Sequence, residues 1–312
     1  MMKRIAIGSM ALLSLLACVS SKSADTGVSS PNESVFVGTS PCADFPKAFL
    51  GIPAGENCDR IKWRLSLNDS GKYVLRREWG YHVDNATYLA RGTTNIEGRW
   101  KTTKGGTNTP VLVQLENSKH SLAFALVDKN VLHLLDANRN LASGDSGASY
   151  TLSRDPKSSV INNGSHGPAT ETNLNAETVF SGRSPCQEIA KDLNRPVPAD
   201  CFKLKWLLTL RRDPKTLTPT TYHLAGTLYR TENPDTEFPR EGKWKVSKGT
   251  KTNPNAVVYQ LDAAGDDGPI SLLKADHNVL FFVGKDGNLL LGNEDFSYTL
   301  NRDFKDRRLP SY

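Results

Sequence analysis

The sequence has no methionine after residue 10 and no long hydrophobic run after residue 17. All three methionines, Met1, Met2 and Met10, lie near the N-terminus, so the rest of the chain offers no thioether ligand to a soft metal such as copper. The apolar run from Ile5 to Leu16 is shorter than the roughly 20 residues that span a hydrocarbon core. The sequence therefore predicts no membrane-spanning helix and argues against a methionine-based copper site.

The chain also lacks a concentrated run of one charge. Its 39 Lys and Arg and 33 Asp and Glu are spread along the sequence, and removal of Lys3 and Arg4 with a signal segment leaves a formal charge of +4. A nucleic-acid surface needs a clustered basic stripe. We therefore expect no nucleic-acid partner.

Residues 1–17 have the three regions of a secretory signal. Lys3 and Arg4 precede the apolar run, and Leu15-Leu16-Ala17-Cys18 resembles a bacterial lipobox, in which the cysteine is lipidated and becomes the first residue. Several acyl chains on one cysteine give durable membrane attachment, since each buried methylene contributes about 0.8 kcal/mol. We predict a lipoprotein signal peptide at 1–17 and lipidation of Cys18, with the membrane as a partner through that lipid.

Residues 18–33 form the next expected segment. After Cys18 they are rich in Ser, Asp, Asn and Gly with almost nothing apolar to bury, which is typical of a flexible tether. Val19 stands where an acidic residue would direct a lipoprotein away from the outer membrane. The expected location is the cell envelope, with the lipid in the outer membrane.

An internal duplication dominates the remainder of the chain. IKWRLSL from Ile61 recurs as LKWLLTL from Leu204, EGRWKTTKG from Glu97 as EGKWKVSKG from Glu241, and ASYTLSRD from Ala148 as FSYTLNRD from Phe296. The matches keep their order at offsets of 143 to 148 residues. We assign one domain to 34–155 and a second to 178–303, with a linker at 156–177 and a tail at 304–312.

Each copy shows the period of two that is typical of β-strands. Ile61, Trp63, Leu65 and Leu67 alternate with polar residues, as do Leu122, Phe124 and Leu126, and turn signals such as Asp286-Gly287 separate the runs. Outside the signal, only the segment from Cys186 to Asn194 suggests a helix. We expect about eight short antiparallel strands a copy.

A sheet of about eight short strands has no unpaired edge strand when it closes into a small barrel. We therefore favour a barrel over a sandwich. The predicted fold is all-β: two tandem, small, antiparallel, lipocalin-like β-barrels joined by a flexible linker. Because the linker is rich in Ser, Asn, Gly and Thr, we expect the barrels to move relative to each other.

Four cysteines remain besides Cys18, one pair in each copy. Four cysteines allow three pairings, and the duplication favours Cys42 with Cys58 and Cys186 with Cys201. A disulfide across such a loop contributes about 3 kcal/mol in the chain-entropy model. The alternative is a reactive dithiol or a thiolate metal site, which an oxidising compartment disfavours.

Several short motifs together resemble the N-terminal domain of NlpE-type lipoproteins. They are Gly38-Thr39-Ser40-Pro41-Cys42-Ala43-Asp44, Gly98-Arg99-Trp100, Leu134-Leu135-Asp136 and Tyr150-Thr151-Leu152-Ser153-Arg154. Members of that family are outer-membrane proteins with a lipocalin-like barrel that are linked to copper tolerance, surface adhesion and envelope stress signalling. The resemblance covers most of both copies and implies the same fold and a related role.

Two departures from the family pattern bear on that role. The family has a Cys-x-x-Cys in its first loop, whereas Phe45 and Ile189 occupy the second cysteine's position here, which removes the closely spaced thiols that favour soft metals. The second half is another N-type barrel rather than a different C-terminal domain. We expect no metal and no other cofactor.

Other motifs have ordinary structural explanations. Gly144-Asp145-Ser146-Gly147 resembles a serine-protease motif without the matching histidine, and Asp136, Asn138 and Asn140 resemble a calcium loop without its terminal Glu. Both are interpreted as turns. We interpret the six histidines as surface or core residues, and the paired tryptophans as core residues rather than the lining of a cleft; they are His82, His120, His133, His166, His223 and His277, and Trp63, Trp100, Trp206 and Trp244.

The function expected from these observations is that of a non-enzymatic envelope lipoprotein. It would act as an interaction, envelope-stress or surface-sensing module with an envelope protein partner, linked through the family to copper tolerance. One alternative is a lipocalin-like carrier of a small apolar ligand. Another is an enzyme whose catalytic residues no motif reveals.

Overall fold

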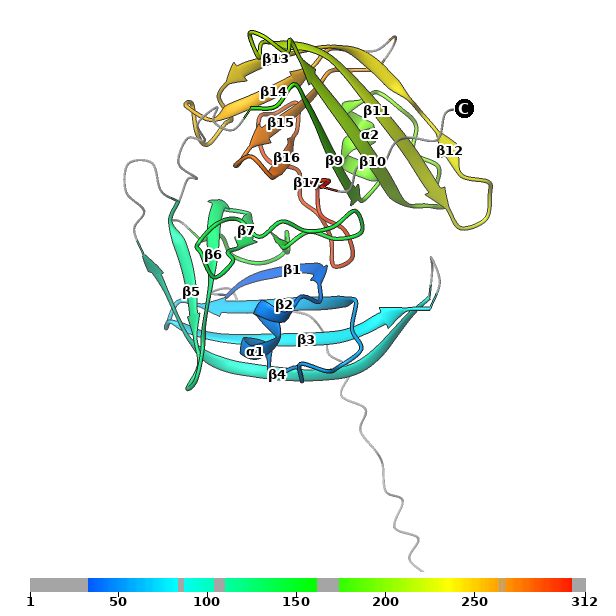
Figure 1. Ribbon diagram of the computed structural model, residues 1–312. Coiled ribbons are helices and arrows are strands. Elements are labelled where there is room, and N and C mark those ends of the chain that lie inside the picture. The colour runs from blue at the N-terminus through cyan, green and yellow to red at the C-terminus, as the bar shows by residue number, and fades with distance from the viewer. Residues whose placement is uncertain are drawn as a thin grey trace, which may run out of the picture.

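The computed structural model describes residues 33–83, 87–103, 110–161, 174–263, 265 and 267–304. Within them the chain forms two closed antiparallel β-barrels in tandem, each with one short helix (Figure 1). The predicted all-β fold with two tandem barrels is confirmed. The predicted signal peptide, Cys18 and most of the tether lie outside the described residues, as do most of the linker and the tail after Phe304.

Barrel 1 closes in simple up-and-down order, because its first strand pairs with both its second and its last strand. Its elements are β1 (Glu33–Pro41), α1 (Asp44–Leu50), β2 (Arg60–Asn68), β3 (Lys72–His82), β4 (Tyr88–Thr103), β5 (Leu112–Glu116), β6 (Ser121–Asp128), β7 (Val131–Leu134) and β8 (Thr151–Arg154).

Barrel 2 repeats this order, with its last strand paired to its first and one extra short strand, β12, on the edge of β11. Its elements are β9 (Glu177–Ser184), α2 (Gln187–Asp192), β10 (Cys201–Arg212), β11 (Pro219–Arg230), β12 (Thr236–Glu237), β13 (Arg240–Lys248), β14 (Val257–Leu261), β15 (Ile270–Lys274), β16 (Val279–Val283) and β17 (Thr299–Arg302).

The interiors of both barrels are filled by the alternating apolar residues of the strands. Ile61, Trp63, Leu65 and Leu67 are all buried, while the residues between them are partly exposed. The equivalent tryptophan, Trp206, is fully buried, and the indole Nε1 atoms of Trp63 and Trp206 donate to Ser40 and Ser184 Oγ at 2.9 and 2.8 Å. Trp63, Trp206 and Trp244 belong to the cores of their barrels, and Trp100 is partly buried against the core of barrel 1.

Two disulfides tie the loop after the first strand of each barrel to the region of its second strand. Cys42 is bonded to Cys58, and Cys186 is bonded to Cys201. The pairing predicted from the duplication is therefore confirmed. These four cysteines offer no free thiolate to a metal.

The two barrels pack against each other through strands that are buried on both faces. In β6, Leu122, Phe124 and Leu126 point into barrel 1, whereas Ala125 and Val127 belong to a separate apolar cluster shared with barrel 2. The whole cluster consists of Ala125, Val127, Val131, Leu135, Leu141, Ala256, Leu273, Ala275, Val279, Phe281, Val283 and Leu289. We call it the inter-barrel core.

The contact between the barrels has an approximate two-fold symmetry. Gly144 N donates to Asn301 Oδ1 and its counterpart Gly292 N donates to Ser153 Oγ, both at 2.9 Å. On the axis, Thr151 Oγ1 and its counterpart Thr299 Oγ1 lie 2.9 Å apart. Matching surface patches that meet in this way form an isologous interface, as in a symmetric homodimer.

This packing does not agree with the expectation that the barrels move independently. The composition of the linker carries no information about the outer faces of the strands, and those faces decide whether the barrels associate. The described part of the predicted linker also contributes to packing, because Ile161 is buried in the core of barrel 1 and Ser158 Oγ accepts from Val35 N at 3.0 Å. The two copies therefore form one body.

Candidate functional site

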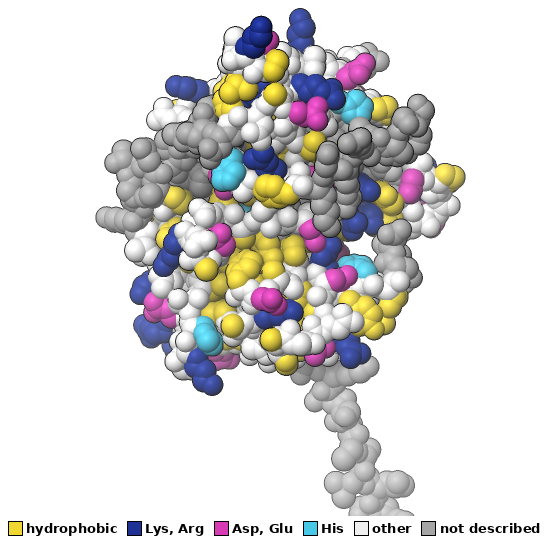
Figure 2. All heavy atoms as spheres, in the orientation of Figure 1, with side chains coloured by type: hydrophobic (Ala, Val, Ile, Leu, Met, Phe, Trp, Pro, Cys, Tyr) yellow, Lys and Arg dark blue, Asp and Glu magenta, His cyan; other side chains and the backbone are white. Residues whose placement is uncertain are grey.

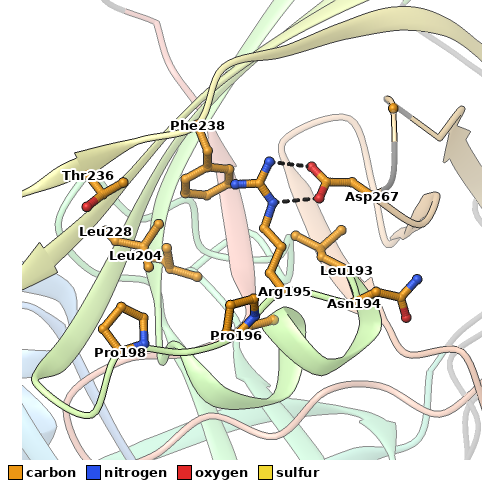
Figure 3. Close-up of a pocket in the computed structure, with 12 residues that line it drawn as sticks. Leu193, Asn194, Arg195, Pro196, Pro198, Leu204, Leu228, Thr236, Phe238 and Asp267 are labelled. Atoms are coloured by element: carbon orange, nitrogen blue, oxygen red, sulfur yellow. Dashed lines mark hydrogen bonds and ion pairs between the residues drawn. The ribbon is translucent and has the colours of Figure 1, made fainter.

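A cavity of about 550 Å³ opens at the end of barrel 2 beside α2 (Figure 3). Its wall is formed mainly by Leu204 of β10, Leu228 of β11, Phe238, and Leu193, which follows α2. Pro196 and Pro198 complete it from the loop between α2 and β10. The cavity is therefore an apolar mouth of the barrel, and we refer to it as the mouth pocket.

The bottom of the mouth pocket rests on the filled barrel interior. Phe238 packs edge-on against Trp206, with ring centroids 5.5 Å apart. Phe238 reaches this position because Gly226 lies beneath its ring: a Cβ atom at residue 226 would stand 2.3 Å from Phe238 Cζ. A ligand would occupy the mouth and would not reach the centre of the barrel.

The polar groups at the rim are satisfied by one another. Arg195 Nε and Nη2 donate to the two carboxylate oxygens of Asp267 at 2.5 and 2.7 Å. The hydrogen bond to Asp267 raises the pKa of Arg195, and its guanidinium lies 5.4 Å from the centre of the Phe238 ring. This bidentate pair joins the loop after α2 to the loop between β14 and β15 at one side of the mouth pocket. Because the two charged groups bind each other, the surface that faces a ligand is the apolar wall.

The equivalent region of barrel 1 carries larger side chains. Ile61, the counterpart of Leu204, pairs with Trp79, whereas Leu204 pairs with Leu228. Arg77 stands at the position of Gly226 and lies 4.8 Å from the centre of the Trp79 ring. Burial lowers the pKa of Arg77 to about 10. Trp79 thus stands in barrel 1 where barrel 2 has the smaller Leu228 at the mouth pocket, while Phe238 occupies the space over Gly226.

His133, His82 and the protease-like motif serve structural roles, and His166 lies outside the described residues. His133 is fully buried at the inter-barrel core, where its ring meets Phe281 edge-on at 5.6 Å. His82 hydrogen-bonds Asp59. Asp145 of the motif accepts from Gly147 N and Ala148 N, which makes it a turn residue, and also binds Arg60.

The calcium-like motif is likewise a turn. Asp136 Oδ1 accepts from Asn138 N and Asn140 N at 2.8 and 2.9 Å, so the carboxylate is used by the backbone of its own hairpin. Across the described residues, no group of three or more His, Cys, Asp and Glu side chains could hold a metal ion.

The mouth pocket was not predicted from the sequence. The aligned copies differ in side-chain size at one position that lines it, because Trp79 in the first copy corresponds to Leu228 in the second. This difference indicates a pocket only once it is known that the position faces the barrel interior. A size difference of this kind at an inward position indicates unequal cavities in two otherwise similar barrels.

The surface is mixed in charge. On the face shown in Figure 2, Lys and Arg side chains are interspersed with Asp and Glu over both barrels, and hydrophobic side chains gather on barrel 1. In the part of the chain that the structure describes, no helix is long and apolar enough to cross a membrane. Comparison with known proteins found no family model, curated protein or solved structure that matches this chain.

Proposed function

We propose that this chain is a non-enzymatic, lipid-anchored protein of the bacterial envelope, of the NlpE-like type. It acts by binding, as an interaction or envelope-sensing module. The lipobox-like segment at Cys18 and the two disulfides support an exported, anchored protein. The filled barrels support a rigid scaffold that presents binding surfaces.

The mouth pocket carries the more specific part of this proposal, which is that barrel 2 binds a small apolar ligand. Its volume of about 550 Å³ lies within the range of small-molecule sites, and its wall is mostly apolar with one fixed polar pair, Arg195 and Asp267. In a sensing role the bound ligand would be the signal. In a carrier role, the second candidate, it would be the cargo.

Copper enters this proposal only through the family resemblance. All four cysteines of the barrels are in disulfides, and the chain has no methionine after Met10. We therefore assign no copper site to the barrels.

Filling the mouth pocket tests the ligand proposal. Leu228→Trp gives barrel 2 the side chain that barrel 1 has at this position, and we expect it to weaken binding of the neutral fluorophore N-phenyl-1-naphthylamine at least tenfold, because the indole occupies the ligand's volume. Fluorescence titration of the purified, signal-free protein measures the affinity.

The matched control is Lys245→Trp, which adds an indole to the exposed outer face of β13 in the same barrel. It should bind the fluorophore as the wild type does. Equal affinity of the wild type and Leu228→Trp, or no binding by the wild type, would show that the mouth pocket is not the ligand site.

The lipid anchor has a separate test. Cys18→Ser removes the thiol sulfur to which the predicted lipid attaches, so the variant expressed in a bacterium should lose incorporation of labelled palmitate and should leave the membrane fraction. The full-length wild type should retain both. Palmitate incorporation that persists in Cys18→Ser would contradict lipidation at this cysteine.

A further inference from the structure

The long strand β4 of barrel 1 has a free edge. It pairs with β3 from Tyr88 to Arg99, but with β5 only from Arg99 to Thr103. On the β5 side, no described residue pairs with the backbone of 88–98. The register with β3 shifts between Trp79 and Gly80, so the regular part of this edge is 92–98. We call 92–98 the open edge; β4 lies at the bottom of barrel 1 in Figure 1.

The composition of the open edge allows it to accept another strand. In an antiparallel pair, alternate residues direct their N–H and C=O groups to the same side, so about half of the residues in 92–98 direct theirs away from β3. The segment reads Gly-Thr-Thr-Asn-Ile-Glu-Gly. It contains no proline or lysine, the residues that commonly block such an edge, and three β-branched residues that favour strands.

Barrel 2 does not have an equivalent edge. Its strand β13 begins at Arg240, the counterpart of Ile96, and so lacks most of the length that is free in β4. Arg240 Nη2 also donates to Gly268 O at 2.8 Å, which ties the loop after β14 to the start of β13. In barrel 1 the corresponding hairpin closes on itself, with Asn117 N donating to His120 O at 3.0 Å. Among the described residues, the open edge is therefore a feature of barrel 1.

A buried cation lies on the neighbouring strand, opposite the open edge. Arg77, on the inward face of β3, pairs with Thr94 and is 5 % exposed. Its Nε and Nη1 atoms have no hydrogen-bond partner among the described residues, and neither does the buried Nε1 atom of Trp79. Burial lowers the pKa of Arg77 to about 10. Buried donors without a partner cost free energy, and a charged acceptor beside them removes this cost.

Trp79 and Arg77 both extend toward β4. The ring of Trp79 lies over Gly92, since a Cβ atom at residue 92 would stand 2.2 Å from Trp79 Cζ2. The guanidinium carbon of Arg77 lies 4.8 Å from the centre of that ring. Neighbouring strands are about 4.8 Å apart, so a strand added at the open edge would place an inward residue about 10 Å from Arg77 between Cα atoms. An arginine and a glutamate side chain can together span this gap over the small Thr94.

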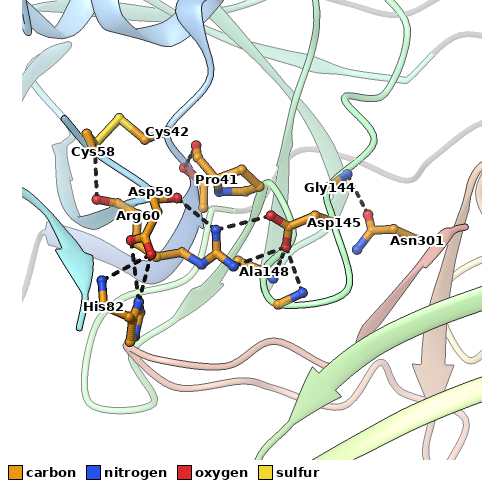
Figure 4. A network of polar contacts seen from close by, with 12 residues as sticks. Pro41, Cys42, Cys58, Asp59, Arg60, His82, Gly144, Asp145, Ala148 and Asn301 are labelled. Carbon is orange, nitrogen blue, oxygen red and sulfur yellow. Dashed lines mark hydrogen bonds and ion pairs between the residues drawn. A yellow bond between two sulfur atoms is a disulfide. The ribbon is translucent and has the colours of Figure 1, made fainter. Parts of the chain in front are cut away.

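The loop between α1 and β2 bounds Arg77 on the other side and leaves the open edge clear. Gly51 lies next to the guanidinium, since a Cβ atom there would stand 3.4 Å from Arg77 Nη2. The end of the loop is fixed to β3, because Asp59 Oδ2 accepts from His82 N at 3.0 Å (Figure 4). No backbone hydrogen bond joins this loop to the open edge. The loop therefore does not occupy the position of an added strand.

We propose that the open edge binds an extended, acidic segment of an envelope protein partner, with β4 pairing its backbone and Arg77 binding a carboxylate from it. In this mode of recognition the main-chain hydrogen bonds supply affinity and the alternate side chains supply specificity. A carboxylate suits Arg77 because hydrogen bonds between two charged groups are the stronger ones. The inference rests on the interaction role proposed above and does not use the mouth pocket.

The probe is a fluorescein-labelled peptide of sequence KTVTETVTK. In an extended chain its valines and central glutamate share one face, which would point into the barrel, and its threonines share the other. Anisotropy titration of the purified, signal-free protein should show saturable binding. The peptide KTVTQTVTK, which lacks the carboxylate, should bind at least tenfold more weakly. Absence of saturable binding, or equal binding of the two peptides, would overturn the proposal.

Arg77→Met removes the cation and keeps a long side chain inside the barrel. We expect it to bind the glutamate peptide at least tenfold more weakly than the wild type does, and to bind both peptides equally. The matched control is Arg76→Met, which removes an exposed cation from the opposite face of β3 and should behave as the wild type. An unchanged preference for the glutamate peptide in Arg77→Met would overturn the role of Arg77. If Arg77→Met does not fold, the comparison of the two peptides on the wild type still decides the question.

Hydrogen exchange locates the bound peptide. The glutamate peptide should slow amide exchange in 92–98 and leave β13 unchanged, and Leu228→Trp should bind it normally, which separates this site from the mouth pocket. Loss of peptide binding in Leu228→Trp would place the peptide in the mouth pocket and overturn the proposal. Protection of 92–98 that rises with protein concentration in the absence of peptide would show that the edge pairs with a second copy, which would also overturn it.

Discussion

Leu273→Asp is expected to uncouple the two barrels. Leu273 is 6 % exposed and belongs to the inter-barrel core, while its neighbour Leu272 points into barrel 2. An aspartate here places a carboxylate among apolar side chains of the other barrel, at a cost of about 3 to 5 kcal/mol when no counter-charge compensates it. The barrels can avoid most of this cost by separating.

Calorimetry measures the effect. The wild type should unfold in one transition, because the barrels stabilise each other, whereas Leu273→Asp should show two transitions with the first at a lower temperature. Val74→Asp, on the exposed outer face of β3 in barrel 1, is the matched control and should behave as the wild type. A single, unshifted transition in Leu273→Asp would contradict a stabilising interface.

Trp206→Ala is expected to destabilise barrel 2 by about 3 to 5 kcal/mol, the usual loss for a buried aromatic replaced by alanine. Trp206 is 0 % exposed, and its ring packs on Phe238 and Phe282 at 5.5 and 5.2 Å between centroids. The variant also loses the hydrogen bond from Nε1 to Ser184 Oγ. Urea unfolding measures the loss of free energy.

Two companion variants make the result specific. Trp63→Ala should cause a loss of similar size in barrel 1, where Trp63 is the counterpart. Trp206→Phe should retain most of the stability because it keeps a ring in the same place. A change below about 0.5 kcal/mol in Trp206→Ala, the range of ordinary surface substitutions, would contradict the assignment of this residue to the core.

The repeat and the strands could be predicted because both leave periodic patterns in the sequence. Alternation from Ile61 to Leu67 predicted β2, and the two cysteine pairs predicted the disulfides. α1, of seven residues, was not predicted, because a helix of two turns is too short for a sustained period; it ends at Gly51, which has a φ of 63°. α2 lies inside the segment from Cys186 to Asn194 that suggested a helix.

The interface could not be predicted from alternation alone. The sequence pattern drew attention to Leu122, Phe124 and Leu126, which face the interior of barrel 1, whereas the residues that meet barrel 2 are Ala125 and Val127. Two apolar faces on one strand indicate burial on both sides. Only the tertiary arrangement shows whether the second face meets a helix, another barrel or another chain.

The functional site escaped prediction for a related reason. The mouth pocket depends on Leu228 and Gly226 standing where barrel 1 has Trp79 and Arg77, and these differences are meaningful only once the inward face is known. The resemblance to NlpE-type lipoproteins stays a prediction. In the first loop, Cys42 is bonded to Cys58, which lies 16 residues further along the chain.

The central claim is that the two copies form one two-fold body, and cleavage of the chain between residues 161 and 174 tests it most directly. A specific protease site inserted there allows the purified protein to be cut into two barrels and passed over a sizing column. The account predicts that the cut halves elute together at the size of the intact protein, and that Leu273→Asp makes them separate. Cut wild-type halves that elute separately at micromolar concentration would contradict the claim.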